Sequence, residues 1–561
     1  MFKKKRQKTI DVDEVFLDSV NIPDFNKDQF EGRIEKPIST KSMTAIGVLF
    51  LCVILLFTIK ISLHQIRDGE KYKTISENNR LRHDIIFAYR GVINDRLGVP
   101  LAWNEFNSDN PFPKRLYVED GFSNLLGYIK YPQKDKSGFY YTTETTGQDG
   151  IETYFNDRLA GTNGVKLTEV DVRGEVHSES DIILPKNGEE VVLSIDSRIQ
   201  DRMFYYIKDA VLTSGFKGGA GVMMNVKTGE IIALATYPEY NSNIMTSGQD
   251  STIISNYFKN KSNPFLDRSV SGLFVPGSII KPFMALAALN EKVVTPETEI
   301  LSTGALTIPN PYDPSKPTVF KDWKAHGYTA VREAIAVSSD VYFYQVGGGY
   351  KSQKGIGIEK IDDYLKKFLF GEPTVDFFAG PKGNIPTPEW KEKTFGEKWL
   401  LGNTYHTSIG QYGFQVTPLQ MVRALTGIVN EGTIVHPVIE KGLQGERTEI
   451  SGIDTSYYKI VKEGMRDAVL FGTAKALNIG GVTSGGKTGT AEIGTEKGRV
   501  NSWIEGFVPY NDPKYVFAIV LENGPNAYKV GSPATMSFLF QWMKENTPEY
   551  LGLTPKEDNI D

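Results

Sequence analysis

The feature that most constrains the fold is a run of 18 residues without a charge, from Ser42 to Ile59. A helix of this length and composition can cross a lipid bilayer. The apolar residues 61–63 extend it, and Lys60 can reach the interface. A buried core helix rarely runs so long without a charge, and a cleaved signal peptide does not fit, because 41 residues precede the run and no small-residue cleavage site follows it. We therefore predict a membrane anchor at residues 42–63.

Basic residues near both ends of the run bear on its orientation. They are Lys3, Lys4, Lys5, Arg6, Lys8, Lys36 and Lys41 before the span, and Lys60, Arg67, Lys71 and Lys73 after it. The residues next to the span are nearly balanced, but a short basic tail is retained in the cytoplasm more easily than the roughly 500 residues that follow. We expect residues 1–41 inside and the bulk of the chain outside, where nucleoside triphosphates are not available.

Composition narrows the classes of function. The chain has 561 residues, with 63 basic and 68 acidic side chains, and this near balance gives no basic domain for nucleic acid. Its charged fraction of 23% and aromatic fraction of 11% exclude a disordered or fibrous chain. The single cysteine, Cys52, lies in the predicted span and excludes intrachain disulfides and thiolate metal cages. Six scattered histidines argue against a histidine-rich metal site, so we predict no metal, no cofactor and no nucleic-acid partner.

Outside the anchor the pattern changes near residue 187. Residues 64–186 look polar and irregular, with many turn signals, and we interpret them as a spacer. Beyond them we expect a strand at 190–195, a helix from Ser197 to about Val211, and a strand, tight turn and strand over 221–235. A buried strand is also expected at 515–521. Strands at both ends with helices between them predict an α/β (α+β) domain over 187–546, a mixed sheet flanked by helices with an inserted helical part, and then a polar tail at 547–561.

The sharpest candidate for chemistry is Ser278-Ile-Ile-Lys281. Pro276-Gly277 before a run of good helix formers places a helix start at or near Ser278, so the hydroxyl and the amine share one helix face. Burial and the positive end of the helix both disfavour the ammonium form of Lys281. A neutral amine beside a hydroxyl can activate a serine without a histidine. From this motif alone the alternative stays open that Ser278 is a helix cap and Lys281 reaches solvent.

Two further motifs are ambiguous by themselves. Ser338-Ser339-Asp340 follows a helical stretch at 330–337 and is typical of a helix cap. Residues 481–488 match the phosphate-loop pattern G-x-x-x-x-G-K-T. A phosphate loop, however, leaves a buried strand and opens a helix, whereas here a helical stretch precedes the motif and glycines follow it. An extracytoplasmic location also removes the nucleotide, so we do not favour an ATPase.

Taken together, Ser278-x-x-Lys281, Ser338-x-Asp340 and Lys487-Thr-Gly489 resemble, in this order, the active site of penicillin-binding proteins and serine β-lactamases. The rest of the chain resembles a class B, monofunctional penicillin-binding protein. The resemblance implies a penicillin-binding transpeptidase domain at 187–546 on a pedestal, or dimerisation-like domain, at 64–186. The stretches that carry it outside the site are residues 77–80, 90–98, 150–152, 159–161, 408–411 and 416–420.

The chain departs from the family pattern at several positions. Asp340 replaces the usual Asn of the second motif, a variant of the cell-elongation branch, which favours elongation over septal division. Tyr412 stands where the family has Gly, and Leu97 where the pedestal has Asn. Asp322 and His326 resemble part of a zinc site found in some elongation-type relatives. Their spacing is compressed and no cysteine is available, so we predict no metal there.

The resemblance implies acyl transfer. Ser278 would attack the carbonyl between the last two D-alanines of a peptidoglycan stem peptide, and Lys281 would accept its proton. The terminal D-alanine would leave, and an amine of a neighbouring stem peptide would attack the acyl-enzyme to form the cross-link. Ser338 would relay a proton to the leaving amine, and Asp340 would hold Lys281 in position. The carboxylate of Asp340 favours the ammonium form of Lys281 and so opposes the effect of burial on this amine.

The remaining implied roles concern substrate binding. Backbone N–H groups of Ser278 and Thr490 would form the oxyanion hole. The terminal carboxylate of the substrate, or of a β-lactam, would lie against Lys487, Thr488, Gly489 and Thr490. Trp503 could line this cleft or belong to the core.

Several functions share this site. A D,D-carboxypeptidase would pass the acyl group to water, a septal transpeptidase would act at division, and a β-lactam-sensing receptor would need more membrane spans. A catalytically silent scaffold is disfavoured by the intact Ser/Lys pair. Only about 120 residues lie between the anchor and the catalytic domain, too few for a glycosyltransferase domain. We therefore expect a multi-spanning glycan polymerase and an elongation complex as partners, at the bacterial cytoplasmic membrane.

Overall fold

The structure is a computed structural model that describes residues 39–71, 73, 81–106, 111–136, 139–170, 176–310, 313, 315–374, 380–494 and 498–554. Contacts between Cα atoms divide the chain into two units. The first consists of Met1–Asp84 and Lys166–Ile182, and the second of Ile85–Val165 and Ile183–Asp561.

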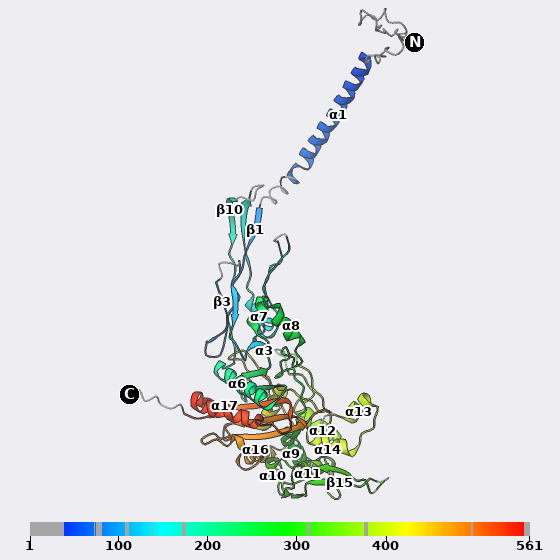
Figure 1. The fold of residues 1–561 in the computed structure, drawn as a ribbon, viewed down its shortest axis with the longest axis vertical. Coiled ribbons are helices and arrows are strands. Elements are labelled where there is room, and N and C mark those ends of the chain that lie inside the picture. The colour runs from blue at the N-terminus through cyan, green and yellow to red at the C-terminus, as the bar shows by residue number, and fades with distance from the viewer. Residues whose placement is uncertain are drawn as a thin grey trace, which may run out of the picture. The chain divides into compact units, whose positions relative to one another are not determined.

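The first unit contains the predicted membrane helix. Helix α1 spans Thr40–Arg67, and the hydroxyl of Ser39 caps it by accepting a hydrogen bond from the amide of Ser42. At 1.5 Å per residue, its 28 residues measure about 42 Å, enough to cross a bilayer. It is the one helix in the described ranges that is long and apolar enough for this, and none of its residues is buried (Figure 1). The unit also holds most of a three-stranded sheet, β1-β9-β10 (Leu81–Ile86, Gly164–Val170, Val176–Ile183).

The second unit begins with short strands. Four of them form a sheet in the order β11-β2-β3-β4 (Val191–Val192, Ile93–Asn94, Pro100–Glu105, Lys114–Tyr117). The expectation of an irregular spacer is therefore wrong, and the strand expected at 190–195 shrinks to two residues. Such short strands are fixed by distant pairing partners, Val191 with Ile93 for example, and leave little alternation in the sequence. The other elements here are β5 (Ile129–Lys130), β6 (Gln133–Lys134), β7 (Tyr140–Thr142), β8 (Thr146–Gly147), α3 (Ser123–Leu126), α4 (Gly150–Tyr154) and α5 (Asn156–Leu159).

A buried ionic cluster, the Glu152 cluster, lies beside this sheet. The carboxylate of Glu152 accepts hydrogen bonds from Arg90 Nε at 2.5 Å, Arg115 Nε at 2.8 Å and the Tyr117 hydroxyl at 3.1 Å. Burial alone would raise the pKa of Glu152, but the guanidinium groups of Arg115 and Arg90 outweigh burial and lower it. The cluster joins two of the family-like stretches, 90–98 and 150–152.

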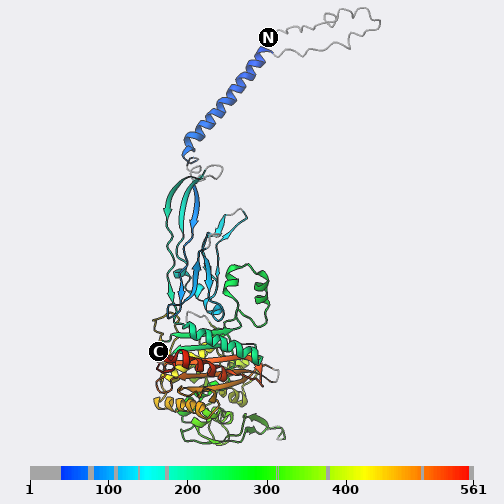
Figure 2. The same cartoon turned by 60° about the vertical axis from the view of Figure 1, so that its left-hand side comes forward.

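The centre of the second unit is a five-stranded sheet in the order β13-β12-β22-β21-β20 (Figure 2). Its strands are β12 (Gly218–Asn225), β13 (Ile231–Tyr237), β20 (Gly485–Glu492), β21 (Arg499–Val508) and β22 (Tyr515–Pro525). The predicted strand-turn-strand and the predicted strand at 515–521 are confirmed. Every pairing in it is antiparallel, which corrects the expected mixed sheet. The α/β class itself holds.

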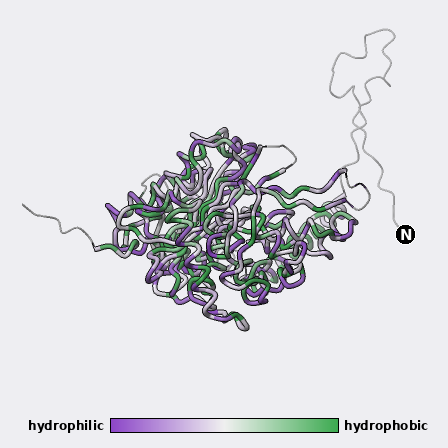
Figure 3. The backbone as a smooth tube through the Cα atoms, turned by 90° about the horizontal axis from the view of Figure 1, so that it is seen from below, coloured by the Kyte–Doolittle hydropathy of each residue, from purple (hydrophilic) through white to green (hydrophobic). Residues whose placement is uncertain are grey.

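Helices cover both faces of this sheet (Figure 1). On one face, α6 (Ser197–Ser214) and α17 (Ser532–Asn546) enclose one apolar core. On the other face, a larger core contains α9 (Lys281–Asn290), α11 (Asp340–Gly348), α15 (Pro418–Val429) and residues of α10 (Val331–Val337) and α16 (Thr455–Leu470). Figure 3 shows short hydrophobic and hydrophilic stretches alternating along the chain, the pattern of elements with one buried face.

The remaining elements of the second unit connect these layers. The helices are α7 (Ser242–Ser247), α8 (Ser251–Lys259), η4 (Gly277–Ile280), α12 (Ile358–Lys367), α13 (Pro388–Phe395), α14 (Leu401–Ser408), η5 (Lys475–Leu477) and η6 (Pro548–Leu551). Three two-stranded sheets pair β14 (Ile300–Ser302) with β17 (Gly327–Thr329), β15 (Ala305–Ile308) with β16 (Thr318–Lys321), and β18 (Thr433–Val435) with β19 (Arg447–Glu449).

Candidate active site

Ser278 and Lys281 lie where a helix begins, as predicted. The first turn is a 3-10 helix, η4, and α9 continues from Lys281. Pro282 causes no break because it occupies the first turn of α9, where its missing N–H is not needed. The side chain of Lys281 is fully buried, and Ser278 is partly exposed. The alternative in which Lys281 reaches solvent is therefore wrong.

Backbone segments hold this helix start in place. The amide of Gly277 donates to the carbonyl of Gly410 at 2.8 Å, and Phe274 pairs with Val416 in a β-bridge. A Cβ on Gly410, whose φ is 76°, would come within 2.2 Å of the Gly277 carbonyl oxygen. A glycine is required there, and the family-like stretches 408–411 and 416–420 thereby position Ser278.

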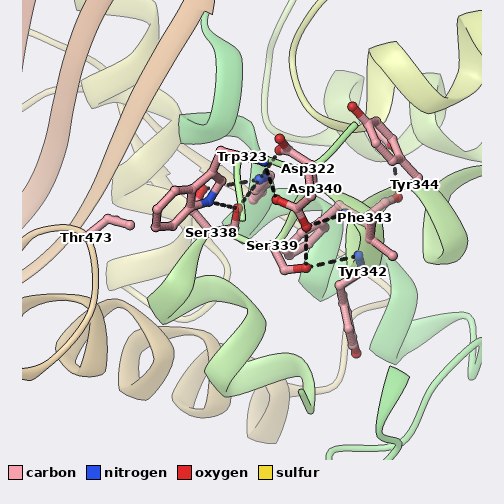
Figure 4. Close-up of polar contacts among 12 residues, drawn as sticks. Asp322, Trp323, Ser338, Ser339, Asp340, Tyr342, Phe343, Tyr344 and Thr473 are labelled. Carbon is pink, nitrogen blue, oxygen red and sulfur yellow. Dashed lines mark hydrogen bonds and ion pairs between the residues drawn. The ribbon is translucent and has the colours of Figure 1, made fainter. Parts of the chain in front are cut away.

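The second motif joins two helices. Ser339 is the N-cap of α11, so the cap expected from the sequence is real, but Ser338 has another role. Ser338 ends α10 in a left-handed conformation with φ of 59°, a costly geometry for a residue with a side chain. Figure 4 shows Ser338, Ser339 and Asp340 around this turn. The turn brings Ser338 and Asp340 within hydrogen-bond distance of Lys281.

The two lysines meet at Ser338. The amine of Lys281 donates to the Ser338 carbonyl at 2.9 Å and hydroxyl at 3.2 Å, and to the carboxylate of Asp340 at 2.6 Å. The amine of Lys487 donates to the same Ser338 hydroxyl at 2.8 Å. One hydroxyl therefore connects two buried amines that come from different motifs.

Lys487 lies on a strand, not in a phosphate loop. Residues 485–492 form β20 and pair with β21 along their whole length, so the ATPase alternative has no structural basis. Lys487 is fully buried. Burial, and then the charge of Lys281, lower its pKa well below the ordinary value, and Asp340 and Glu505 oppose this shift.

These elements surround a cleft of about 420 Å³. It is lined by Ser278, Trp323, Ser338, Asp340, Thr473, Thr488, Gly489, Thr490, Ser502, Trp503, Asn526, Tyr528 and Pro533. The structure thus brings six of the candidate site residues to one cleft, while Lys281 and Lys487 reach it through Ser338. Strand β20 lies so close to η4 that a Cβ on Gly489 would be 2.9 Å from the carbonyl oxygen of Pro276.

The sequence interpretation missed several lining residues. Trp323 donates its indole N–H to the Ser338 carbonyl at 3.3 Å, and Thr473 accepts a hydrogen bond from the Thr488 hydroxyl at 2.7 Å. Neither residue belongs to a motif of its own. Trp323 is adjacent to Asp322, which resembles part of the zinc site of some elongation-type relatives. Trp503 is both core and lining, because it is fully buried and its indole donates to the Val275 carbonyl at 3.0 Å.

The donor set near Asp322 does not fit a zinc site. Asp322 accepts hydrogen bonds from Ser339 Oγ and the Val341 amide, both at 3.0 Å, so it positions the start of α11. His326 Nε2 lies 3.5 Å from its other oxygen. In the described ranges, no group of three or more His, Cys, Asp or Glu residues could hold a metal.

Tyr412, the departure from the family's glycine, adopts the left-handed conformation that a glycine would favour, with φ of 62°. Its ring packs edge-on against Trp390 and Trp399, with centroids 6.0 and 5.8 Å away. Aromatic packing thus offsets the backbone strain at this position.

Comparison with known proteins identifies the fold and chemistry. Residues 219–539 match the penicillin binding protein transpeptidase domain, and residues 110–193 match the penicillin-binding protein dimerisation domain. The chain belongs to the penicillin-binding protein transpeptidase family. It is 30% identical over 478 residues to the peptidoglycan D,D-transpeptidase MrdA of Haemophilus influenzae, covering 78% of this chain and 71% of that protein.

Solved structures agree with this assignment. A Pseudomonas aeruginosa PBP2 in complex with WCK 5153 superposes with a TM-score of 0.67 at 27% identity, covering 82% of this chain and 97% of that one. A chain from a peptidoglycan synthase complex superposes with a TM-score of 0.70 at 24% identity, covering 93% and 100%. The predictions of a serine-type D,D-transpeptidase of peptidoglycan synthesis and of the elongation-type branch are thus confirmed.

Proposed function

We propose that Ser278 is the nucleophile of this transpeptidase and that Lys281 is its base. The observation that carries the proposal is the chain of hydrogen bonds Lys281–Ser338–Lys487 at the edge of the cleft that Ser278 lines. Among the described residues, no hydrogen bond engages the Ser278 hydroxyl, which is therefore free to meet a substrate carbonyl. Lys281 acts as the base in its amine form, with the proton of the Lys281–Asp340 pair on the carboxyl. It takes the hydroxyl proton as Ser278 attacks the stem peptide and D-alanine leaves.

Ser338 and Asp340 complete the proton path in this proposal. The Ser338 hydroxyl, bonded to both amines, passes a proton from Lys281 to the leaving amine, and Asp340 holds Lys281 in place. Backbone N–H groups of Ser278 and Thr490 stabilise the oxyanion, a contribution of about 10²–10³ in rate for a donor of this kind. The amine of Lys487, the side chains of Thr488 and Thr490 and the backbone of Gly489 bind the terminal carboxylate of the stem peptide or of a β-lactam.

The same proposal extends to domains and location. The domains are a cytoplasmic tail at 1–41, an anchor at 42–63, a pedestal at 64–186, a transpeptidase domain at 187–546 and a polar tail at 547–561. The match of residues 110–193 to a dimerisation domain and the length of α1 support this division. The chain is anchored once in the bacterial cytoplasmic membrane, with its N-terminus inside and its catalytic domain outside.

The partner in this proposal is a multi-spanning glycan polymerase within an elongation complex. Support comes from the similar chain in a synthase complex whose solved structure concerns the coordination of polymerization and crosslinking. Co-purification of the full chain from membranes tests this, with a chain lacking residues 1–63 as the control. If the chain lacking residues 1–63 recovered the polymerase as well as the full chain does, the anchor would have no role in this contact.

Covalent labelling tests the assignment of the nucleophile. Purified protein treated with penicillin should carry an adduct on the peptide containing Ser278, found by mass spectrometry. Ser278→Ala should abolish labelling by a fluorescent penicillin and keep the thermal unfolding temperature. Ser456→Ala, an exposed serine on α16, is the matched control and should label normally. Persistent labelling of Ser278→Ala would show another nucleophile.

A further inference from the structure

A second acid lies behind the cleft, and the mechanism above does not use it. Glu505, on β21, is fully buried. Neither of its carboxyl oxygens has a hydrogen-bond partner among the described residues. A buried carboxyl without partners is costly, so this position calls for an explanation.

The register of the sheet places Glu505 directly beside Lys487. The two residues are opposite each other in the antiparallel pair β20–β21, so their side chains project from the same face of the sheet. The neighbours of Glu505 on this face are apolar: Trp503 and Phe507 along β21, and Ala518 across on β22. Lys487 is therefore the cation that faces this carboxyl.

Lys487 in turn lacks a close counter-ion within the part of the chain that the structure describes. Its recorded hydrogen bonds go to neutral acceptors, the Ser338 hydroxyl and the Thr488 carbonyl, both at 2.8 Å. Asp340 is engaged 2.6 Å from Lys281. The charges of the two lysines and two acids would balance if Asp340 compensates Lys281 and Glu505 compensates Lys487.

Building on the proposed function, we propose that Glu505 is a positioning residue that shares one proton with Lys487. At rest the proton is on the carboxyl and the amine is neutral, so that no net charge is buried. At rest the two side chains are register neighbours that make no hydrogen bond to each other. When the carboxylate of a stem peptide or β-lactam reaches Lys487, they move into hydrogen-bond contact, the O–H bond of Glu505 breaks and an N–H bond of Lys487 forms. The ammonium then binds the ligand, and Glu505 carries the compensating charge.

Electrostatics support a shared proton. Burial raises the pKa of Glu505 well above its ordinary value, and Lys487 opposes this shift. The charged groups that act on Lys487 are Lys281 from α9, Asp340 from α11 and Glu505 from β21. Because Lys281 and Asp340 form a pair, Glu505 is the acid left to supply or accept a proton at Lys487.

The pH profile of acylation tests this inference. The second-order rate of acylation by fluorescent penicillin is measured for the full chain in detergent between about pH 6 and 10. In Glu505→Gln the ammonium group of Lys487 has no internal proton source and no compensating charge, so the pKa of Lys487 falls. The alkaline limb of the profile should move to lower pH by about one unit, the effect expected for loss of a nearby opposite charge. Glu505→Asp should restore part of the shift.

Two variants separate this role from packing. Glu522→Gln removes another carboxylate of the same sheet, one that pairs with Arg268 at 2.7 Å, and should leave the profile unchanged. Glu505→Leu, which fills the site with an apolar side chain, should raise the unfolding temperature and still show the shifted limb. Identical profiles for wild type and Glu505→Gln would overturn the inference while leaving the nucleophile assignment intact. If the wild-type chain were not labelled by fluorescent penicillin at any pH, the proposed function would be overturned instead.

Discussion

Two buried charge clusters of this molecule differ in how completely they are paired. In the Glu152 cluster, one carboxylate accepts hydrogen bonds from two guanidinium groups and a tyrosine hydroxyl. In the catalytic cluster, two amines share the single hydroxyl of Ser338, and Glu505 has no hydrogen-bond partner among the described residues. Both clusters are almost wholly removed from solvent.

The difference separates a structural cluster from a reactive one. Where both oxygens of a buried carboxylate accept hydrogen bonds, as in Glu152, protonation is resisted and the geometry is fixed. In the catalytic cluster two amines share one acceptor, and burial, followed by the charge of Lys281, lowers the pKa of Lys487 well below its ordinary value. Substitutions in the first cluster should therefore change stability, and substitutions in the second should change acylation.

The largest expected effect is on the base. Lys281→Met should slow acylation by about 10²–10⁴-fold, the usual contribution of a general base. Stability should change by no more than about 1–2 kcal/mol, because Asp340 retains contact with solvent in the cleft and Met fills a similar volume. Fluorescent penicillin kinetics and thermal unfolding measure the two quantities. Normal acylation of this variant would reduce Lys281 to a structural residue and remove the contrast between the clusters.

Glu152→Gln should give the opposite outcome. Leaving Arg90 and Arg115 without their carboxylate should cost about 3–5 kcal/mol of unfolding free energy, with the acylation rate of the folded fraction unchanged. The control Glu189→Gln removes an exposed carboxylate 3.6 Å from Arg158 and should cost less than about 0.5 kcal/mol. A variant that kept its stability but lost acylation would break the comparison.

The same cluster sets a pH dependence of stability. The pKa of Glu152 is lower in the folded chain than its ordinary value of 4.5. Its contribution is therefore fully present above pH 4.5 and is lost as the pH falls through the lowered folded value. Denaturant titrations of wild type and Glu152→Gln should converge in this acid window. A difference between them that stays constant down to the lowest pH would contradict the pairing.

The sequence predicts what depends on local pattern and leaves out what depends on distant pairing. An uncharged run is enough to predict α1, and two short apolar runs separated by a tight turn predict β12 and β13. The sheet β11-β2-β3-β4 was missed because two of its strands, Val191–Val192 and Ile93–Asn94, are too short to show alternation. The antiparallel order of the central sheet follows from pairing between β12 and β22, nearly 300 residues apart in the chain, which no local pattern indicates.

The candidate site follows the same rule. Ser278, Lys281, Ser338 and Lys487 belong to motifs that can be read from the chain. Glu505 belongs to none, and its place beside Lys487 is set by the register of β20 against β21. A charged residue within an otherwise apolar strand was the one signal in the sequence that could have drawn attention to it.

Ser338 allows its hydroxyl and its backbone to be tested separately. Ser338→Ala and Ser338→Gly both remove the hydroxyl that joins the two amines, and each should slow acylation by about 10- to 100-fold, the loss of a hydrogen bond to a charged group. Only glycine relieves the left-handed φ of 59°, so Ser338→Gly should be more stable than Ser338→Ala by about 1 kcal/mol. Unfolding curves and labelling rates of the pair measure both effects. Equal stabilities would show that the turn carries no strain.

The smallest expected effect lies at the rim of the catalytic cluster. The indole of Trp323 donates to the same Ser338 carbonyl that accepts from Lys281, but at a longer distance, 3.3 Å against 2.9 Å. Trp323 as a residue is 60% exposed. Trp323→Phe keeps the aromatic surface and removes the donor. Since a neutral hydrogen bond contributes about 0.5–1.5 kcal/mol, acylation should slow by about two- to tenfold, with little change in unfolding temperature. A loss as large as that of Lys281→Met would mean that the carbonyl of Ser338, and not its hydroxyl, controls the position of the base.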